Sequence, residues 1–378
     1  MIGNLDQETL QDIWWLIASL VGSLFLFLTF VQGGQTLLFT VARNELDKSL
    51  IVNSIGRKWE LTFTTLVLFG GALFAAFPLF YATSFGGAYW VWMLILFTFI
   101  GQAVSFEYRS KPGNLLGAKT YEGFMFINGS LGLLLIGAAV GTFFTGSSFV
   151  LNPYHSVAWQ TPFHGLEAAT NPFNLGLGLF LVFLARTLGA LYLVNNLDHP
   201  PLTGRCRRAA WNNFLCSLPF LLGVLAGLLT MRGFAVDPAT GQVSMEVGKY
   251  LHNLLAMPLV AMLLLAGLSG VIWGVISVRF LNQDGGIWFA GLGTVLVGLA
   301  LFSLAGYHHT AFYPSVSDLQ SSLTIHNASS SHYTLTAMTY VALAVPGVVA
   351  YIWYVWRQMD AKRLSPAEMK GEYAKELY

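Results

Sequence analysis

The stretch IWWLIASLVGSLFLFLTFVQGGQTLLFTVA, residues 13–42, contains no charged residue and is long enough to cross a membrane as a helix. A spanning helix needs about 20 mostly apolar residues, each rising about 1.5 Å. Eight further mostly apolar stretches follow, at 60–84, 87–108, 121–145, 173–197, 209–231, 253–280, 286–306 and 333–356. The sequence therefore predicts an all-α membrane protein, a bundle of about nine transmembrane helices.

The basic residues between these stretches alternate from one side of the predicted membrane to the other. Arg232 and Lys249 fall on one side and Arg186 falls inside a stretch, whereas the other sixteen of the nineteen Lys and Arg fall on the second side. Translocation disfavours Lys and Arg in short loops, so the basic side is predicted to be cytoplasmic. The N-terminus is then outside and the C-terminus cytoplasmic, which requires an odd number of spans.

The composition indicates one membrane bundle rather than several soluble domains. Hydrophobic residues make up 55% of the chain and charged residues 10%, well below the roughly 25% of soluble domains. Because helices in lipid must pack on one another to satisfy polar groups, residues 1–356 are predicted to form a single bundle and 357–378 a cytoplasmic tail. The net charge of +1 gives no sign of nucleic-acid binding, and no metal-ligand spacing occurs.

Three carboxylates, Glu60, Glu107 and Glu122, lie at the predicted cytoplasmic ends of spans two to four. Charged groups in a membrane are costly and therefore informative. We expect these carboxylates to converge at one mouth of the bundle and to take up protons from the cytoplasm. The alternative is that Glu60 and Glu107 pair with Lys58 and Arg109, or are solvated at the interface.

Arg186 falls about midway along the stretch 173–197. A cation at that depth must face the bundle interior or a polar partner. The candidates for its partner are a carboxylate, a ligand headgroup and another subunit, and we favour a structural pairing.

The eight histidines all fall in predicted loops or at the ends of spans. They are His155, His164, His199, His252, His308, His309, His326 and His332. A haem within a membrane bundle usually takes its axial His or Met from helix interiors. The chain is therefore not expected to ligate a haem through histidine.

Short motifs along the chain match those of a known family. They are Ile13-Trp14-Trp15, Asn53-Ser54-Ile55 with Trp59-Glu60, Gly70-Gly71-Ala72-Leu73-Phe74-Ala75-Ala76-Phe77-Pro78 and Phe106-Glu107-Tyr108-Arg109-Ser110-Lys111. Together they resemble subunit II of the cytochrome bd quinol oxidases, whose segments include Gly-Gly-Ala-Leu-Phe-Ala-Ala-Trp-Pro and Phe-Asp-Tyr-Arg-Ser-Lys. The resemblance covers nearly the whole chain.

The resemblance implies a nine-helix subunit of a quinol:oxygen oxidoreductase in the bacterial cytoplasmic (inner) membrane. Its partner, subunit I, is expected to carry two b-type haems, one d-type haem and the quinol site. Subunit II is expected to stabilise subunit I, without activity alone, and to offer a proton path in which Glu60 matches an acidic position of the family. Further expected partners are membrane lipids and small single-helix subunits, and some members hold a structural quinone in this subunit.

Two departures from the family pattern bear on the proton path. Gln32-Gly33-Gly34-Gln35 stands where the family commonly has Asp-Gly-x-Asp, so both acids are amides. Lys58 replaces the usual His before Trp59. Any proton step through the two acids is absent or rerouted in this chain.

Two other functions remain open from the sequence. A secondary transporter would use Arg186 to bind an anionic substrate and Gly33-Gly34 to break a helix at mid-membrane. A purely structural scaffold for subunit I would have no proton role, and substitution of the three carboxylates would distinguish it.

Overall fold

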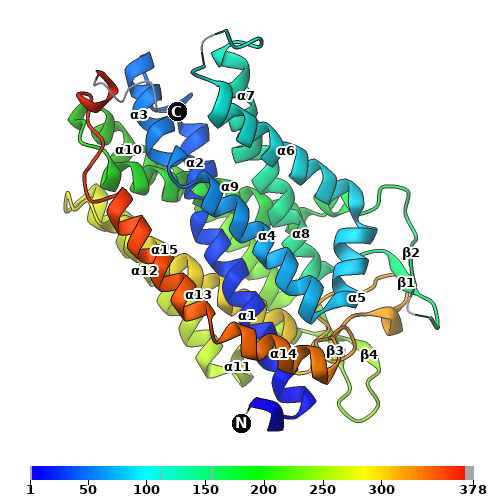
Figure 1. Ribbon diagram of the computed structural model, residues 1–378. Coiled ribbons are helices and arrows are strands. Elements are labelled where there is room, and N and C mark those ends of the chain that lie inside the picture. Colours follow the sequence, from blue (N-terminus) through cyan, green and yellow to red (C-terminus); the bar gives the residue numbers. More distant parts are fainter. Residues whose placement is uncertain (1, 112, 155, 371–378) are drawn as a thin grey trace.

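The computed structural model describes residues 2–111, 113–154 and 156–370, which form a bundle of long helices (Figure 1). Within these residues, nine segments are long and apolar enough to cross a membrane. They are Gln7–Leu37, Glu45–Ala76, Tyr89–Tyr108, Ala118–Thr145, Pro172–Asn196, Pro200–Thr230, Pro258–Arg279, Gly286–Gly306 and His332–Met359. The predicted all-α membrane fold is confirmed.

Four of these spans each contain two α-helices separated by a short turn or a π-helical segment. The pairs are α1 (Gln7–Leu28) with α2 (Phe30–Leu37), α3 (Glu45–Gly56) with α4 (Trp59–Ala76), α7 (Ala118–Ile127) with α8 (Leu133–Thr145), and α14 (His332–Ala342) with α15 (Val345–Met359). The other five spans are α6 (Tyr89–Tyr108), α9 (Pro172–Asn196), α10 (Pro200–Thr230), α12 (Pro258–Arg279) and α13 (Gly286–Gly306).

The two ends of the bundle differ in structure and charge. One end, the hairpin end, carries the start of α1, the short helices α5 (Pro78–Tyr81) and α11 (Lys249–Ala256), and two antiparallel hairpins (Figure 1). The hairpins pair β1 (Phe149–Leu151) with β2 (Val157–Trp159) and β3 (Arg232–Val236) with β4 (Val243–Val247). The opposite end, the basic end, carries α3, the start of α7 and the end of α15; that it faces the cytoplasm stays a prediction.

Two spans extend further toward the basic end than hydropathy indicated. The second begins at Glu45 rather than residue 60, because Asn44 caps α3 by accepting a hydrogen bond from the Asp47 amide. The sixth begins at Pro200 rather than residue 209, with proline in the first turn, where its missing N–H costs nothing. Polar residues in these helical extensions hid them from a hydrophobicity pattern.

Helix α9 lies at the centre of the bundle, where 72% of its apolar segment is buried. Its contact with α2 depends on glycine: a Cβ at Gly33 would overlap the Ala185 carbonyl oxygen, and one at Gly189 would overlap the Gly34 amide. Small residues at such contacts let helix backbones approach closely in membranes. Gly33 and Gly34 lie inside α2, so the helix break expected for a transporter is not found there.

The ninth span, α14 with α15, is attached to the bundle chiefly at its two ends. Only 6% of its apolar segment is buried. Near the hairpin end, the Trp14 indole donates to the Leu335 carbonyl at 3.2 Å and to the Thr339 hydroxyl at 3.0 Å. At the basic end α15 continues to Met359, and residues 371–378 of the predicted tail lie outside the described residues.

Close packing of α2 on α9 predicts that Gly189→Ala destabilises the protein. The added methyl must push the two backbones apart, and overpacking of this kind costs about 1–3 kcal/mol. The matched control is Gly204→Ala, since a Cβ there meets no atom within 4 Å and alanine favours a helix. Thermal unfolding in detergent checks both variants, and equal stability of the two would contradict the packing argument.

Candidate functional site

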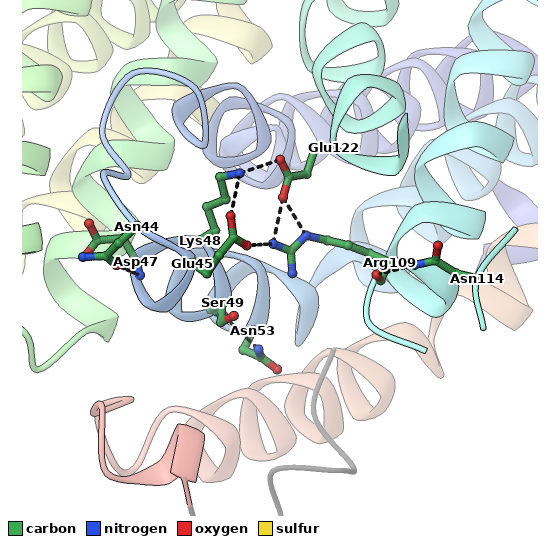
Figure 2. Close-up of polar contacts among 9 residues, drawn as sticks. All are labelled: Asn44, Glu45, Asp47, Lys48, Ser49, Asn53, Arg109, Asn114 and Glu122. Carbon is green, nitrogen blue, oxygen red and sulfur yellow. Dashed lines mark hydrogen bonds and ion pairs between the residues drawn. The ribbon is translucent and has the colours of Figure 1, made fainter. Parts of the chain in front are cut away.

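A network of two acids and two bases joins α3, the end of α6 and α7 at the basic end (Figure 2). The Glu122 Oε1 atom accepts from Arg109 Nε at 3.1 Å and from Arg109 Nη2 at 2.8 Å. The other Glu122 oxygen, Oε2, pairs with Lys48 Nζ at 2.9 Å. Glu45 completes the network, at 3.4 Å from Arg109 and 3.1 Å from Lys48. The four formal charges cancel.

The central pair of this network is buried and the peripheral acid is not. The side chains of Glu122 and Arg109 are 2% and 6% exposed, whereas Glu45 is 76% exposed. Removing one partner of a buried ion pair costs about 3–5 kcal/mol, because the other charge is left uncompensated. The Glu122–Arg109 pair therefore fixes α6 and α7 together.

The turn between α6 and α7 sets the position of Arg109. Arg109 follows the last residue of α6, where a cation interacts favourably with the helix dipole. Asn114 donates to the Arg109 carbonyl at 3.0 Å and accepts from the Gly117 amide at 2.8 Å. Gly117 has φ +77°, which favours glycine, and α7 begins directly after it.

Glu60 and Glu107 do not belong to the network around Glu122. Both are exposed, at the start of α4 and the end of α6. The preceding residues, Trp59 and Phe106, stack with centroids 5.8 Å apart, which brings these two helix ends together. Among the described residues, no ion pair or hydrogen bond involving either carboxylate is found, so convergence of all three acids is not observed.

Lys58 pairs with Asp360 instead of Glu60. The Lys58 side chain is 2% exposed, and its Nζ lies 3.0 Å from Asp360 Oδ1 and 5.1 Å from the Trp356 ring centroid. Asn196 also donates to Asp360 Oδ1, at 3.1 Å. Pairing of Glu60 with Lys58 and of Glu107 with Arg109 is not found among the described residues, where Lys58 pairs with Asp360 and Arg109 with Glu122 and Glu45. Asp360, just past the last apolar stretch, gave no sequence signal that it would meet Lys58.

A buried acid at the basic end, Asp47, was also missed. Asp47, 1% exposed, pairs with Arg205 at 2.7 Å and accepts from the Arg43 backbone amide at 2.9 Å. These contacts tie α3 to α10. Had residues 45–56 been predicted as a helix of the bundle, Asp47 would have been a candidate for a buried ion pair, because it is an acid within that helix.

Arg186 lies at a contact of α9 with α10 and the chain after α2. Its Nε donates to Asn213 Oδ1 at 2.7 Å and its Nη2 to Thr40 Oγ1 at 3.2 Å. No carboxylate of the described residues lies within ion-pair distance. Of the three kinds of partner expected for Arg186, a carboxylate is therefore not found among the described residues. Arg186 also takes no part in the network around Glu122.

Comparison with known proteins identifies the family. The family model described as cytochrome bd terminal oxidase subunit II matches residues 10–359. The chain belongs to this family. It is thus a subunit of a bd-type terminal oxidase, an oxidoreductase complex of the bacterial inner membrane, and a subunit I partner is implied.

The chain matches individual subunit II relatives over nearly the whole length of both proteins. Cytochrome bd-I ubiquinol oxidase subunit 2 of Escherichia coli (strain K12) is 30% identical over 93% of this chain and 95% of that protein. The probable cytochrome oxidase subunit 2 of Haemophilus influenzae is 27% identical over 93% and 94%. Cytochrome bd ubiquinol oxidase subunit 2 of Bacillus subtilis is 27% identical over 95% and 98%. The transporter alternative is not favoured.

Gln32 and Gln35 of α2 are both buried, and Gln32 belongs to a buried polar cluster. Gln32 donates to Gln102 at 3.0 Å, and Asn128 donates to Thr98 at 3.2 Å. Buried side-chain atoms of Gln32, Gln35, Gln102 and Asn128 have no hydrogen-bond partner among the described residues. Since buried amides are nearly always hydrogen-bonded, this cluster is suited to hold internal water. Gln102 was missed because a lone amide in an apolar stretch resembles a packing residue.

The described histidines of this subunit II do not fit axial ligation of a haem in the bundle core. His164, His308, His309 and His326 lie in loops, His199 precedes α10, His252 is in the short helix α11, and His332 begins α14. His155 lies outside the described residues. None of the described histidines lies in the interior of a spanning helix.

The ionic network predicts that Glu122→Gln weakens the fold strongly. Arg109 and Lys48 then lose their shared buried acid, and a loss of about 3–5 kcal/mol is expected. The control is Glu45→Gln, whose exposed carboxylate is worth about 1 kcal/mol or less. Thermal unfolding of the purified subunit assembly measures both, and a Glu122→Gln effect no larger than the control would contradict the clamp.

Proposed function

We propose that this subunit II stabilises a haem-bearing subunit I and has no oxidase activity alone. The family resemblance supports two b-type haems, one d-type haem and the quinol site in the partner. Quinol is oxidised there near the outer face, and oxygen is reduced to water. The resemblance also supports small single-helix subunits and a structural quinone, for which no residues are assigned.

The second part of the proposal is that subunit II conducts protons inward from its basic end, which faces the cytoplasm. The distribution of Lys and Arg supports that orientation. Glu60 and Glu107 are the exposed carboxylates at the mouth, where α4 and α6 meet through the Trp59–Phe106 stack. Glu122 has a different part: held by Arg109 and Lys48, it keeps the helices around that mouth in place.

The observation that best supports the proton path is the buried amide cluster, which lies on the hairpin-end side of the ionic network. Asn128 lies about 9 Å along the helix from Glu122, and Gln102 about 10 Å from Arg109, at 1.5 Å per residue. Asn128 is joined to α6 through its bond to Thr98, and Gln32 of α2 is joined to α6 through its bond to Gln102. Amides do not titrate near neutral pH, so they would pass protons by holding water, in place of the two acids common in the family.

Substitutions at the mouth and in the cluster test this path. Glu60→Gln and Glu107→Gln remove proton acceptors, and Gln102→Leu removes a water ligand. Each is expected to lower oxygen consumption by the purified complex about tenfold or more, since positioned proton-transfer groups contribute at least that much. Haem content should stay unchanged, because none of the three residues lies in the buried ionic network.

Matched controls are Glu8→Gln, an exposed acid at the hairpin end, and Gln283→Leu, an exposed amide at the basic end. Both should turn over normally. Normal turnover in all three test variants would contradict the proton path, and stabilisation of subunit I would then be the only function proposed. Loss in Glu60→Gln and Glu107→Gln with normal Gln102→Leu would reject the amide route while keeping the mouth.

The assignment of haems to the partner predicts a specific spectrum. A complex purified by a tag on this chain should show b-haem bands and a red-shifted d-haem band in a reduced-minus-oxidised spectrum. This chain purified alone should show neither set and should not consume oxygen. Haem retained by the isolated chain would contradict the assignment.

A further inference from the structure

Arg186 has unused hydrogen-bonding capacity at the surface of the bundle. A guanidinium offers five N–H donors, and only Asn213 and Thr40 accept from this one within the described residues. Both acceptors are neutral, and Thr40 is exposed. A cation in a spanning helix almost always has an anionic or carbonyl partner. Because Arg186 has neither among the described residues, we expect an anion from outside them to bind it.

An apolar groove runs between the same two helices toward the hairpin end. It has a volume of about 380 Å³ and is lined by residues that include Phe173, Gly176, Phe220, Gly223, Gly227 and Met231. Phe183 and Phe220 stack between α9 and α10, with centroids 5.8 Å apart, in the stretch between this groove and Arg186. Arg186 and the groove therefore follow one another along a single helix–helix seam.

Small and irregular residues keep this seam open on the outer surface of the bundle. A Cβ at Gly223 would meet no atom within 4 Å, and the nearest atom to one at Gly176 lies 3.7 Å away. Pro219 lies inside α10, where it removes a backbone donor. The neighbouring Leu222 is 64% exposed, so this face of α10 is available to lipid.

We propose that the α9–α10 seam binds an anionic phospholipid from the leaflet at the basic end, with its phosphate at Arg186 and an acyl chain in the groove. Basic pockets between transmembrane helices are typical sites for anionic headgroups. Arg186 lies near the middle of its span, but its guanidinium reaches Thr40, just past the basic-end terminus of the first span, where a lipid phosphate can meet it. The rise from Arg186 to Gly176 is about 15 Å, and an acyl chain crosses about half of a hydrocarbon core of about 30 Å. A single acyl chain therefore matches the distance from the cation to the groove.

Lipid retention by the complete oxidase complex tests the proposal. The complex is purified by a tag on this chain, delipidated in detergent, and titrated with dioleoylphosphatidylglycerol or dioleoylphosphatidylcholine under native mass spectrometry. Wild type should bind the anionic lipid more tightly than the zwitterionic one. Arg186→Gln should weaken phosphatidylglycerol binding about fivefold or more, as expected for one basic group near a lipid phosphate.

Two further variants separate headgroup from groove. Arg279→Gln removes an exposed cation at the end of α12, which lies over the Phe280 ring, and should leave phosphatidylglycerol binding unchanged. Gly223→Leu places a side chain in the groove and should weaken both lipids while keeping the preference between them. Unchanged haem content shows that each variant is assembled.

Three outcomes would overturn the proposal. The first is phosphatidylglycerol binding that is the same in wild type and Arg186→Gln. The second is equal binding of the two lipids by wild type, which would mean that no charge is recognised. The third is normal binding of both lipids by Gly223→Leu, which would place the acyl chain elsewhere.

Discussion

A charged side chain at the centre of a hydrocarbon layer costs roughly 2.5–3.5 kcal/mol on insertion scales, and each unpaired backbone group costs several more. The second cost confines this chain to helices across nine spans of its described residues. The cost of burying a charge explains where the charged side chains of the bundle lie. Lys58, Asp47, Arg109 and Glu122 are all buried, and each has a partner of opposite charge at the basic end.

These pairs also join parts of the chain that are far apart in sequence. Glu122 with Lys48 ties α7 to α3, Asp47 with Arg205 ties α3 to α10, and Lys58 with Asp360 ties the end of α15 to the start of α4. The last contact matters most for the ninth span, since little else of α15 is buried. One end of the bundle is thus fixed by charge, and the proposed proton mouth, between α4 and α6, lies within that fixed frame.

The interior between the ends depends on shape instead of charge. Glycine contacts bring α2 against α9. On another side of α2, Gln32 reaches Gln102 of α6 through a hydrogen bond between neutral amides. The buried amides Gln32, Gln102 and Asn128 give this region polar groups without net charge. Among the described residues no carboxylate is buried there, and the proposed proton path through this segment depends on the water that such amides can hold.

The sequence by itself determined the number of spans, the helical fold and, through short motifs, the family. These properties depend on local composition, because about 20 apolar residues suffice for a helix to cross a membrane. It also marked Glu122, Arg109 and Lys58 as charges worth attention. Only the tertiary structure decided their partners, since an ion pair depends on which helix ends meet in space. The partners are 70 or more positions apart in the sequence in three such contacts: Glu122 with Lys48, Lys58 with Asp360 and Gln32 with Gln102. A local sequence pattern cannot predict contacts between residues so far apart.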